Sequence, residues 1–89
     1  MNNALATADF RLTGQDYFGD PVDMTVHAEL HESGAFQYGN GTCMIFKWSN
    51  GRLEQFDTRY SRVSEETFTE FAYEVLRDRT FEKINIQVV

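Results

Sequence analysis

The chain has 89 residues and carries eight Lys and Arg against fourteen Asp and Glu, so its net charge is −6. This length supports one domain over 1–89 with a single core, and the acidic balance argues against direct binding to a nucleic-acid backbone. One cysteine excludes an internal disulfide, and neither a basic leader nor a run of about 18 apolar residues occurs. We therefore expect a cytoplasmic protein that does not enter a membrane.

The start of the chain predicts one strand and one loop. Residues 1–7 are small and polar, and we expect them to be flexible. Residues 8–13 alternate between apolar and polar side chains, which favours a half-buried strand. Residues 14–21 contain two glycines and the only proline of the chain. They predict a loop beneath which Tyr17 and Phe18 pack.

The middle of the chain predicts three strands that follow one another in an antiparallel meander. Residues 22–31 alternate most regularly, with apolar side chains at the even positions and polar side chains at the odd ones. A second strand covers 35–38 and 42–48 and bends between these segments, where two glycines occur. A third strand, 52–60, continues the even-numbered apolar face. Together they predict a sheet with one apolar and one polar face.

The two turns of this meander follow from the rule that core side chains face core side chains across a sheet. In each turn a two-residue loop would place an apolar residue opposite a polar one, whereas a three-residue loop that ends in glycine restores the match. The first turn then pairs Leu30 with Phe36, and the second pairs Met44 with Phe56.

Residues 64–79 predict the one helix. Apolar side chains recur there with a helical period and form a stripe of Phe68, Phe71, Ala72, Val75 and Leu76. Ser64 precedes two glutamates and is suited to cap the first turn. A final strand, 81–89, follows and packs on the same sheet. Its neighbour is either the first strand or residues 52–60.

The order of these elements is β-β-β-β-α-β, which predicts an α+β fold. One helix, about 64–79, packs on one face of an antiparallel sheet of four to five strands. Each large apolar side chain of the helix gains roughly 1.5–3 kcal/mol when it is buried, so packing on the sheet stabilises the helix.

The solvent side of the predicted helix carries four acidic residues at intervals of four, namely Glu66, Glu70, Glu74 and Asp78. Like charges at this spacing repel and cost the helix on the order of 1 kcal/mol. Tyr73 lies at their border, and we call these five residues the acidic helix face. We predict that this face binds a protein partner with a basic surface, because opposite charge steers the approach. A sharper alternative is a phage or mobile-element inhibitor that imitates nucleic acid.

Three possible metal ligands, His27, Glu29 and His31, share the polar face of the clearest strand. About 13 Å of strand separates the two histidines at ~3.3 Å per residue, which is too far to share one ion unless long side chains converge. We therefore interpret the three as a solvated strand face whose histidines respond to pH between about 5 and 8. We expect no bound metal and no cofactor.

Cys43 is predicted to face outward between Asp23 and Asp57, with no histidine within reach. The two carboxylates would raise the pKa of the thiol and disfavour a nucleophilic thiolate. Cys43, Ile45 and Leu53 instead predict a modest apolar patch on the polar face of the sheet. Two copies of the chain could associate through this patch.

No catalytic triad, CxxC pair, HExxH motif or phosphate-binding loop occurs in the sequence, and we predict a non-enzymatic interaction module. The remaining alternative is a small-molecule-binding or enzyme-accessory domain with a pocket between helix and sheet. That pocket would be lined by Phe36, Tyr38, Trp48, Tyr60 and Phe71.

Overall fold

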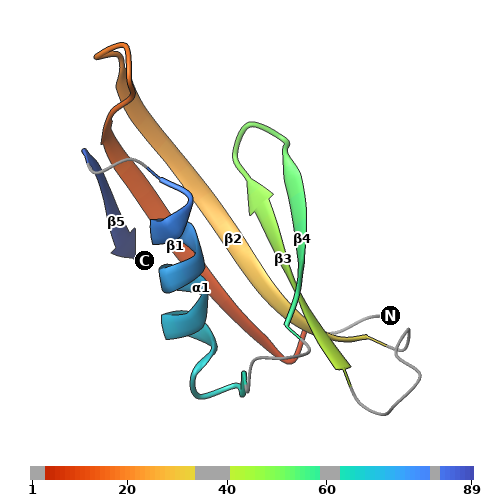
Figure 1. The fold of residues 1–89 in the computed structure, drawn as a ribbon. Helices are drawn as coiled ribbons and strands as arrows, with labels where there is room; N and C mark the ends of the chain where they lie inside the picture. Colours follow the sequence, from red (N-terminus) through yellow and green to blue (C-terminus); the bar gives the residue numbers. More distant parts are fainter. Residues whose placement is uncertain (1–3, 34–40, 59–62, 81–82) are drawn as a thin grey trace.

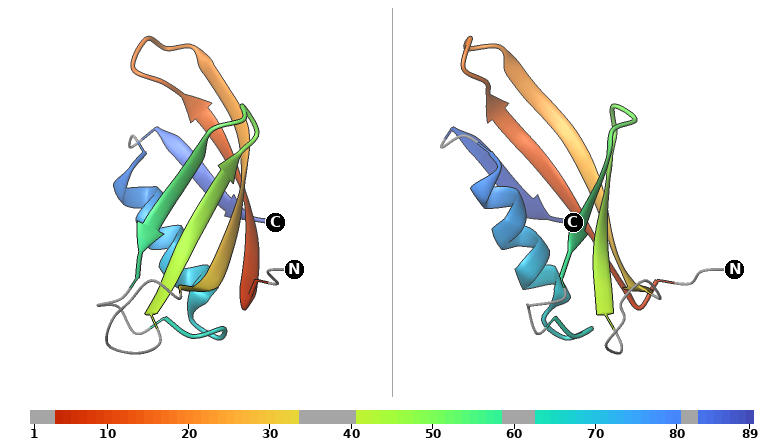
Figure 2. Two further views of the ribbon diagram at one scale, coloured as in Figure 1. Left: turned by 90° about the vertical axis from the view of Figure 1, so that its right-hand side faces the viewer. Right: turned by 45° about the vertical axis from the view of Figure 1, so that its right-hand side comes forward.

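The computed structural model describes residues 4–33, 41–58, 63–80 and 83–89, and these form two layers (Figure 1). One layer is an antiparallel sheet of β1 (Ala6–Gln15), β2 (Pro21–Ser33), β3 (Gly41–Trp48), β4 (Leu53–Asp57) and β5 (Ile84–Val88). The other layer is α1 (Phe68–Asp78), which covers one face of the sheet over β1 and β5 (Figure 2). The predicted α+β fold and its order of elements are confirmed.

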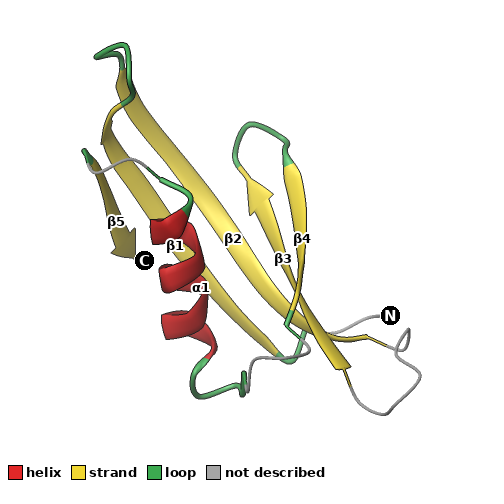
Figure 3. Cartoon of the chain, viewed as in Figure 1, coloured by secondary structure: helices red, strands yellow, loops and turns green. Residues whose placement is uncertain are grey.

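The last strand, β5, pairs with β1, so the strand order is β4-β3-β2-β1-β5 (Figure 3). Of the two neighbours that the sequence allowed, the first strand is therefore the right one. Gly14 lies opposite Ile84 in this pairing and has a φ of +143°. A Cβ at Gly14 would collide with the backbone carbonyl oxygen of Lys83. The close approach of the two strands at this point therefore requires a glycine.

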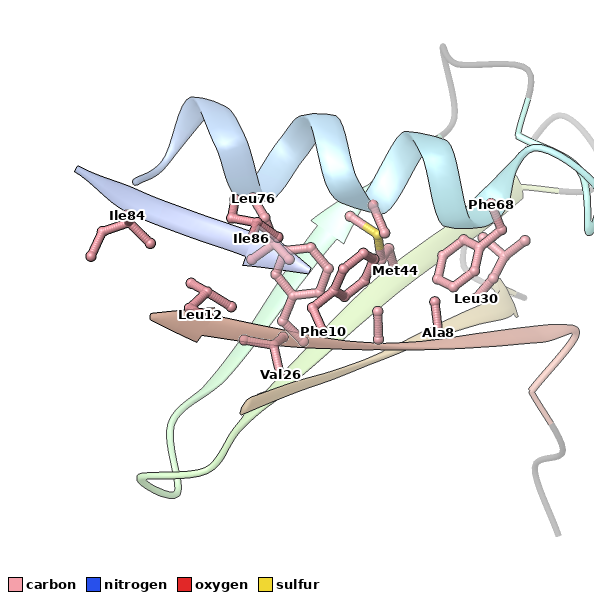
Figure 4. Close-up of a cluster of buried hydrophobic side chains, with 13 residues drawn as sticks. Ala8, Phe10, Leu12, Val26, Leu30, Met44, Phe68, Leu76, Ile84 and Ile86 are labelled. Atoms are coloured by element: carbon pink, nitrogen blue, oxygen red, sulfur yellow. The ribbon is translucent and has the colours of Figure 1, made fainter. Parts of the chain in front are cut away.

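The core lies between α1 and the helix-facing side of the sheet (Figure 4). The strands contribute even-numbered side chains, namely Ala8, Phe10, Leu12, Val26, Ala28, Leu30, Met44, Phe46, Ile84 and Ile86. The helix adds Phe68, Ala72 and Leu76, while Phe71 and Val75 pack against the same cluster from its margin. The predicted apolar stripe and the predicted apolar sheet face therefore meet.

The pairing of β2 with β3 differs from the prediction. Leu30 lies opposite Met44 and not opposite Phe36, and the ladder runs without a break over Gly41–Trp48. The predicted register would have carried two glycines into the middle of a strand, which weakens it. Both registers oppose even-numbered to even-numbered residues, so the core face is the same in each. The predicted strand segment 35–38 lies outside the described residues.

The turn between β3 and β4 follows the predicted register. Met44 lies opposite Phe56. Gly51 ends the connecting loop with a φ of +91°, as a loop of this type requires. β4 ends at Asp57, earlier than the predicted strand 52–60.

The helix α1 begins at Phe68 and not at Ser64. Residues 64–67 form a turn in which Ser64 Oγ accepts the Thr67 N–H at 3.3 Å and Thr67 Oγ1 accepts the Ser64 N–H at 3.0 Å. The Thr67 N–H also donates to the carbonyl oxygen of Ser64, three residues back, whereas the Phe71 N–H donates to that of Thr67, four residues back. The predicted capping residue, Ser64, therefore stabilises a turn. The α-helix starts after this turn, where backbone hydrogen bonds begin to join residues four apart.

The loop between β1 and β2 projects beyond the rest of the sheet (Figure 1). We call its residues 16–20 the hairpin tip. Tyr17 and Phe18 are 80% and 89% exposed, so the expectation that they pack beneath the loop is wrong. The reason is the length of the two strands, which pair as far as Gln15 and Pro21 and carry the loop past the end of the core.

Candidate functional site

The helix α1 presents acidic side chains to solvent because its apolar side is committed to the core. Glu70 and Glu74 are exposed on the helix, and Asp78 is exposed at its last residue. Glu66 is exposed in the turn that leads into the helix. The structure therefore places three of the predicted acidic residues on one helix surface and the fourth directly before it.

The helix dipole stabilises the carboxylate at the start of the helix and disfavours the one at its end. Glu70 lies in the first turn, where the positive end of the dipole stabilises negative charge. Asp78 lies at the other end, where a basic residue such as Arg77 is favoured. Tyr73 is half-buried and packs against the core cluster, so it borders the acidic residues with only part of its ring.

Three carboxylates on the sheet, those of Asp23, Glu29 and Glu54, are paired with Lys or Arg side chains. The ion pairs are Asp23–Arg11, Glu29–Lys47 and Glu54–Arg79. Within the described ranges, Glu66, Glu70, Glu74 and Asp78 make no ion pair and no side-chain hydrogen bond. Their charge is therefore not balanced by the part of the chain that the structure describes.

The sheet face away from α1 holds a connected group of ionisable side chains, which we call the His27 network. His27 Nδ1 lies 2.7 Å from Asp9 Oδ1, and His27 Nε2 lies 2.9 Å from Glu29 Oε2. The other oxygen of Glu29 lies 2.8 Å from His31 Nε2. Lys47 Nζ donates to Glu29 Oε2 at 3.2 Å. Three neighbouring strands are thereby joined across their polar face.

The His27 network favours the charged forms of His27 and Glu29. The hydrogen bond with Asp9 raises the pKa of His27, opposed by partial burial and supported by Glu29. The hydrogen bond with His31 lowers the pKa of Glu29 to about 2, opposed by burial and supported by Lys47 and His27. Both ring nitrogens of His27 face carboxylate oxygens, which suits an imidazolium that donates from each.

The interpretation of His27, Glu29 and His31 as a solvated strand face is therefore wrong for Glu29 and His31, whereas the side chain of His27 is 37% exposed. Glu29 and His31 side chains are each 16% exposed, and both histidines converge on the one carboxylate between them. The sequence could not show this, because Asp9 and Lys47 come opposite His27 only in the observed register. Among the described residues, no group of three or more candidate ligands is placed to hold a metal ion.

Cys43 is buried, and one of its neighbours differs from the prediction. Asp57 lies opposite Cys43 on β4, as expected. On β2, however, His31 and not Asp23 lies opposite it, because the β2–β3 register changed. Burial raises the pKa of the Cys43 thiol, and Asp57 adds to the rise, so the neutral thiol is favoured.

The predicted self-association patch of Cys43, Ile45 and Leu53 is smaller than expected. Cys43 is only 9% exposed and Ile45 is half-buried, whereas Leu53 is 68% exposed. Leu53 therefore provides most of the apolar surface at this place. Association of two copies through it stays a prediction.

A charged cluster on the helix-facing side of β4 was not predicted from the sequence. The Glu54 side chain is 11% exposed, and its carboxylate contacts Arg79, just after α1, and lies 3.3 Å from Arg52 Nη2. Arg79 lies over the ring of Phe56 at 4.8 Å, and Arg52 lies over that of Trp48 at 6.0 Å. These contacts tie the end of the helix to the edge strand. The sequence feature that could have indicated it is the even residue number of Glu54, which places a charged side chain on the core-facing side of the strand.

The predicted pocket between helix and sheet is described only in part. Trp48 is half-buried, and its indole Nε1 is shielded without a hydrogen-bond partner in the described residues. Phe71 is also half-buried and packs against the core. Phe36, Tyr38 and Tyr60 lie outside the described residues, so the pocket stays an expectation.

No protein-family model, no curated protein and no solved structure matches this chain. Within the ranges that the structure describes, no helix is long and apolar enough to cross a membrane. A functional assignment therefore rests on the geometry and charge of the surfaces themselves.

Proposed function

We propose that this protein is a non-enzymatic interaction module of the cytoplasm that docks on a basic surface of a partner protein. Its contact surface is the acidic helix face, composed of Glu66, Glu70, Tyr73, Glu74 and Asp78. The observation that supports this is the absence of ion pairs for the four carboxylates within the described residues, whereas Asp23, Glu29 and Glu54 on the sheet are paired with Lys or Arg. The cytoplasmic setting is supported by a single cysteine, which is buried as a free thiol.

Binding to cations would relieve a repulsion that the helix otherwise carries. Carboxylates four residues apart repel one another, and Asp78 also lies at the unfavourable end of the helix dipole. Lys and Arg side chains of a partner would neutralise both effects. Contacts of this kind mainly raise the association rate and weaken as the salt concentration rises.

Tyr73 supplies an apolar element beside this charge. Its ring is partly buried against the core, so its position is set before a partner arrives. A side chain that is already ordered loses less conformational entropy on binding than a mobile one. Aromatic rings are also enriched in protein interfaces.

The combined substitutions Glu70→Gln, Glu74→Gln and Asp78→Asn test the proposal. A partner is first recovered by affinity capture from cells that make the protein, and is then purified. Titration calorimetry at two salt concentrations compares its binding to the wild-type and variant chains. We expect the variant to bind at least about tenfold more weakly at low salt and to respond less to salt.

The matched control places the same change of net charge on the opposite face of the sheet. It combines Gln55→Lys, Asn85→Lys and Gln87→Lys, all at exposed positions. We expect this control to bind as the wild type does, and thermal unfolding checks that both variants fold. Wild-type affinity in the helix variant, or an equal loss in the control, would show that the acidic helix face is not the docking surface.

A further inference from the structure

The hairpin tip stands clear of both layers of the fold (Figures 1 and 2). β1 and β2 remain paired up to Gln15 and Pro21, and the tip extends beyond them. Its two aromatic side chains, Tyr17 and Phe18, are 80% and 89% exposed. Phe18 is the most exposed large hydrophobic side chain in the described ranges.

The backbone of the hairpin tip is closed by hydrogen bonds around Asp16. Asp16 Oδ1 accepts the N–H groups of Phe18 and Asp20, each at 2.9 Å. The Asp16 N–H donates to the carbonyl oxygen of Asp20 at 3.0 Å, and the Gly19 N–H donates to that of Asp16 at 3.1 Å. Gly19 has a φ of +79°, which glycine adopts readily. The two rings are therefore carried by an ordered loop, which lowers the entropy lost on binding.

The border of the hairpin tip is acidic. Asp16 and Asp20 flank the two rings in the sequence. The nearest cation on β1, Arg11, is held by two hydrogen bonds to Asp23, at 3.1 and 2.9 Å. Anionic lipids and nucleic acids would be repelled by this border. Lys or Arg side chains around a protein pocket would be attracted to it.

We propose that the hairpin tip is a second contact surface, which inserts Tyr17 and Phe18 into an apolar pocket of a partner protein bordered by Lys or Arg. Aromatic anchors that fill such pockets carry much of the affinity in protein interfaces, because they bury a large area with few rotatable bonds. A projecting, ordered tip with two rings has the shape of such an anchor. This contact does not depend on the acidic helix face, since it rests on the exposure and backbone order of the tip.

Photo-cross-linking from position 18 tests the proposal. p-Benzoylphenylalanine replaces Phe18 in one sample and Gln87, an exposed residue of β5, in the control. A protein that is cross-linked from position 18 alone is identified by mass spectrometry and purified. Calorimetry then compares its affinity for the wild-type chain, for Phe18→Ala and for Leu53→Ala, which removes an exposed apolar side chain elsewhere.

The cross-linked product by itself does not count as support. The supporting result is at least about a tenfold loss of affinity for Phe18→Ala, with less than about a twofold change for Leu53→Ala. Lack of an adduct specific to position 18, or wild-type affinity of Phe18→Ala, overturns the proposal.

Two further measurements test whether the hairpin tip binds a lipid surface or a second copy of the chain instead of a partner protein. The probes are vesicles of phosphatidylcholine with phosphatidylglycerol, and the chain alone in sedimentation velocity. Vesicle binding that Phe18→Ala abolishes would assign the tip to a lipid surface, and a dimer that Phe18→Ala dissociates would assign it to a second copy. Either result overturns the proposal. The variant of the acidic helix face separates the two contacts, because it leaves Tyr17 and Phe18 unchanged.

Discussion

The imidazole of His27 lies between two carboxylates that come from different strands, Asp9 on β1 and Glu29 on β2. Lys47 reaches the same Glu29 carboxylate from β3. A single ring therefore links the central part of the sheet on its polar side, and its protonation state affects several contacts at once. Network members of this kind contribute more than isolated surface pairs because they share partners.

The stability of the fold should depend on pH through this network. The folded pKa of His27 lies above its ordinary value of 6.5, so its contribution to the free energy of unfolding is fully present below pH 6.5 and is lost as the pH rises through the folded pKa. The pKa of Glu29 falls from 4.5 to about 2, so its contribution is present above pH 4.5 and is lost as the pH falls towards 2. Together they favour stability between pH 4.5 and 6.5.

Urea unfolding at about pH 5.5 and about pH 8.5 measures the His27 part of this dependence. We expect the wild-type chain to be less stable at the higher pH, and His27→Gln to show a smaller difference. An equal difference in the variant would contradict the role of His27.

The pairing of β1 with β5 depends on a contact that only glycine permits. Gly14 combines a positive φ with direct apposition to the backbone of Lys83. Gly19 in the hairpin tip also has a positive φ, but a Cβ there would meet nothing within 4 Å. A side chain at Gly14 would therefore cause both backbone strain and a steric collision, whereas one at Gly19 would cause backbone strain alone.

Alanine substitution should distinguish these two effects. We expect Gly14→Ala to lower the free energy of unfolding by at least about 2 kcal/mol, because strain and collision add. Gly19→Ala is the control, with an expected loss of about 1 kcal/mol from strain alone. Urea denaturation of both variants measures their free energies of unfolding. Losses of the same size would show that the β1–β5 contact is not tight at Gly14.

Across the whole molecule, the strands differ in how well their backbone hydrogen bonds are protected from local opening. β1 is paired on both sides and covered by α1, whereas β4 lies at the edge of the sheet with β3 as its one neighbour among the described strands. Arg79, just after the helix, links β4 to the helix layer through its contacts with Glu54 and with the ring of Phe56. Edge position and sparse cover are features of segments that open locally.

Amide hydrogen exchange followed by NMR should reveal this difference. We expect the bonded amides of β1 to exchange at least about tenfold more slowly than the β4 amides that are bonded to β3. Glu54→Gln should widen the gap, because it weakens the attachment of β4 to Arg79. Equal protection of β1 and β4 would mean that the sheet opens as a unit.

Several features of this protein follow from short patterns in its sequence. The alternation over residues 22–31 and the helical period of the stripe around Ala72 identified the faces that meet in the core. The Met44–Phe56 pairing was also predictable, since a short loop leaves one register that matches the core. The acidic helix face was found in the same way, because residues four apart share a side of any helix.

Other features depend on segments that are distant in the sequence. Leu30 could pair with Phe36 or Met44 without exposing a core residue, because both registers have the same parity, and the actual register placed His31 opposite Cys43. The partnership of Asp9 with His27 needed the β1–β2 pairing as well. Tyr17 and Phe18 have apolar rings that suggest burial, yet the length of the paired strands carries them past the core. Local periodicity determines which side of an element is buried, whereas the position of each strand along its neighbour emerges only when the sheet assembles.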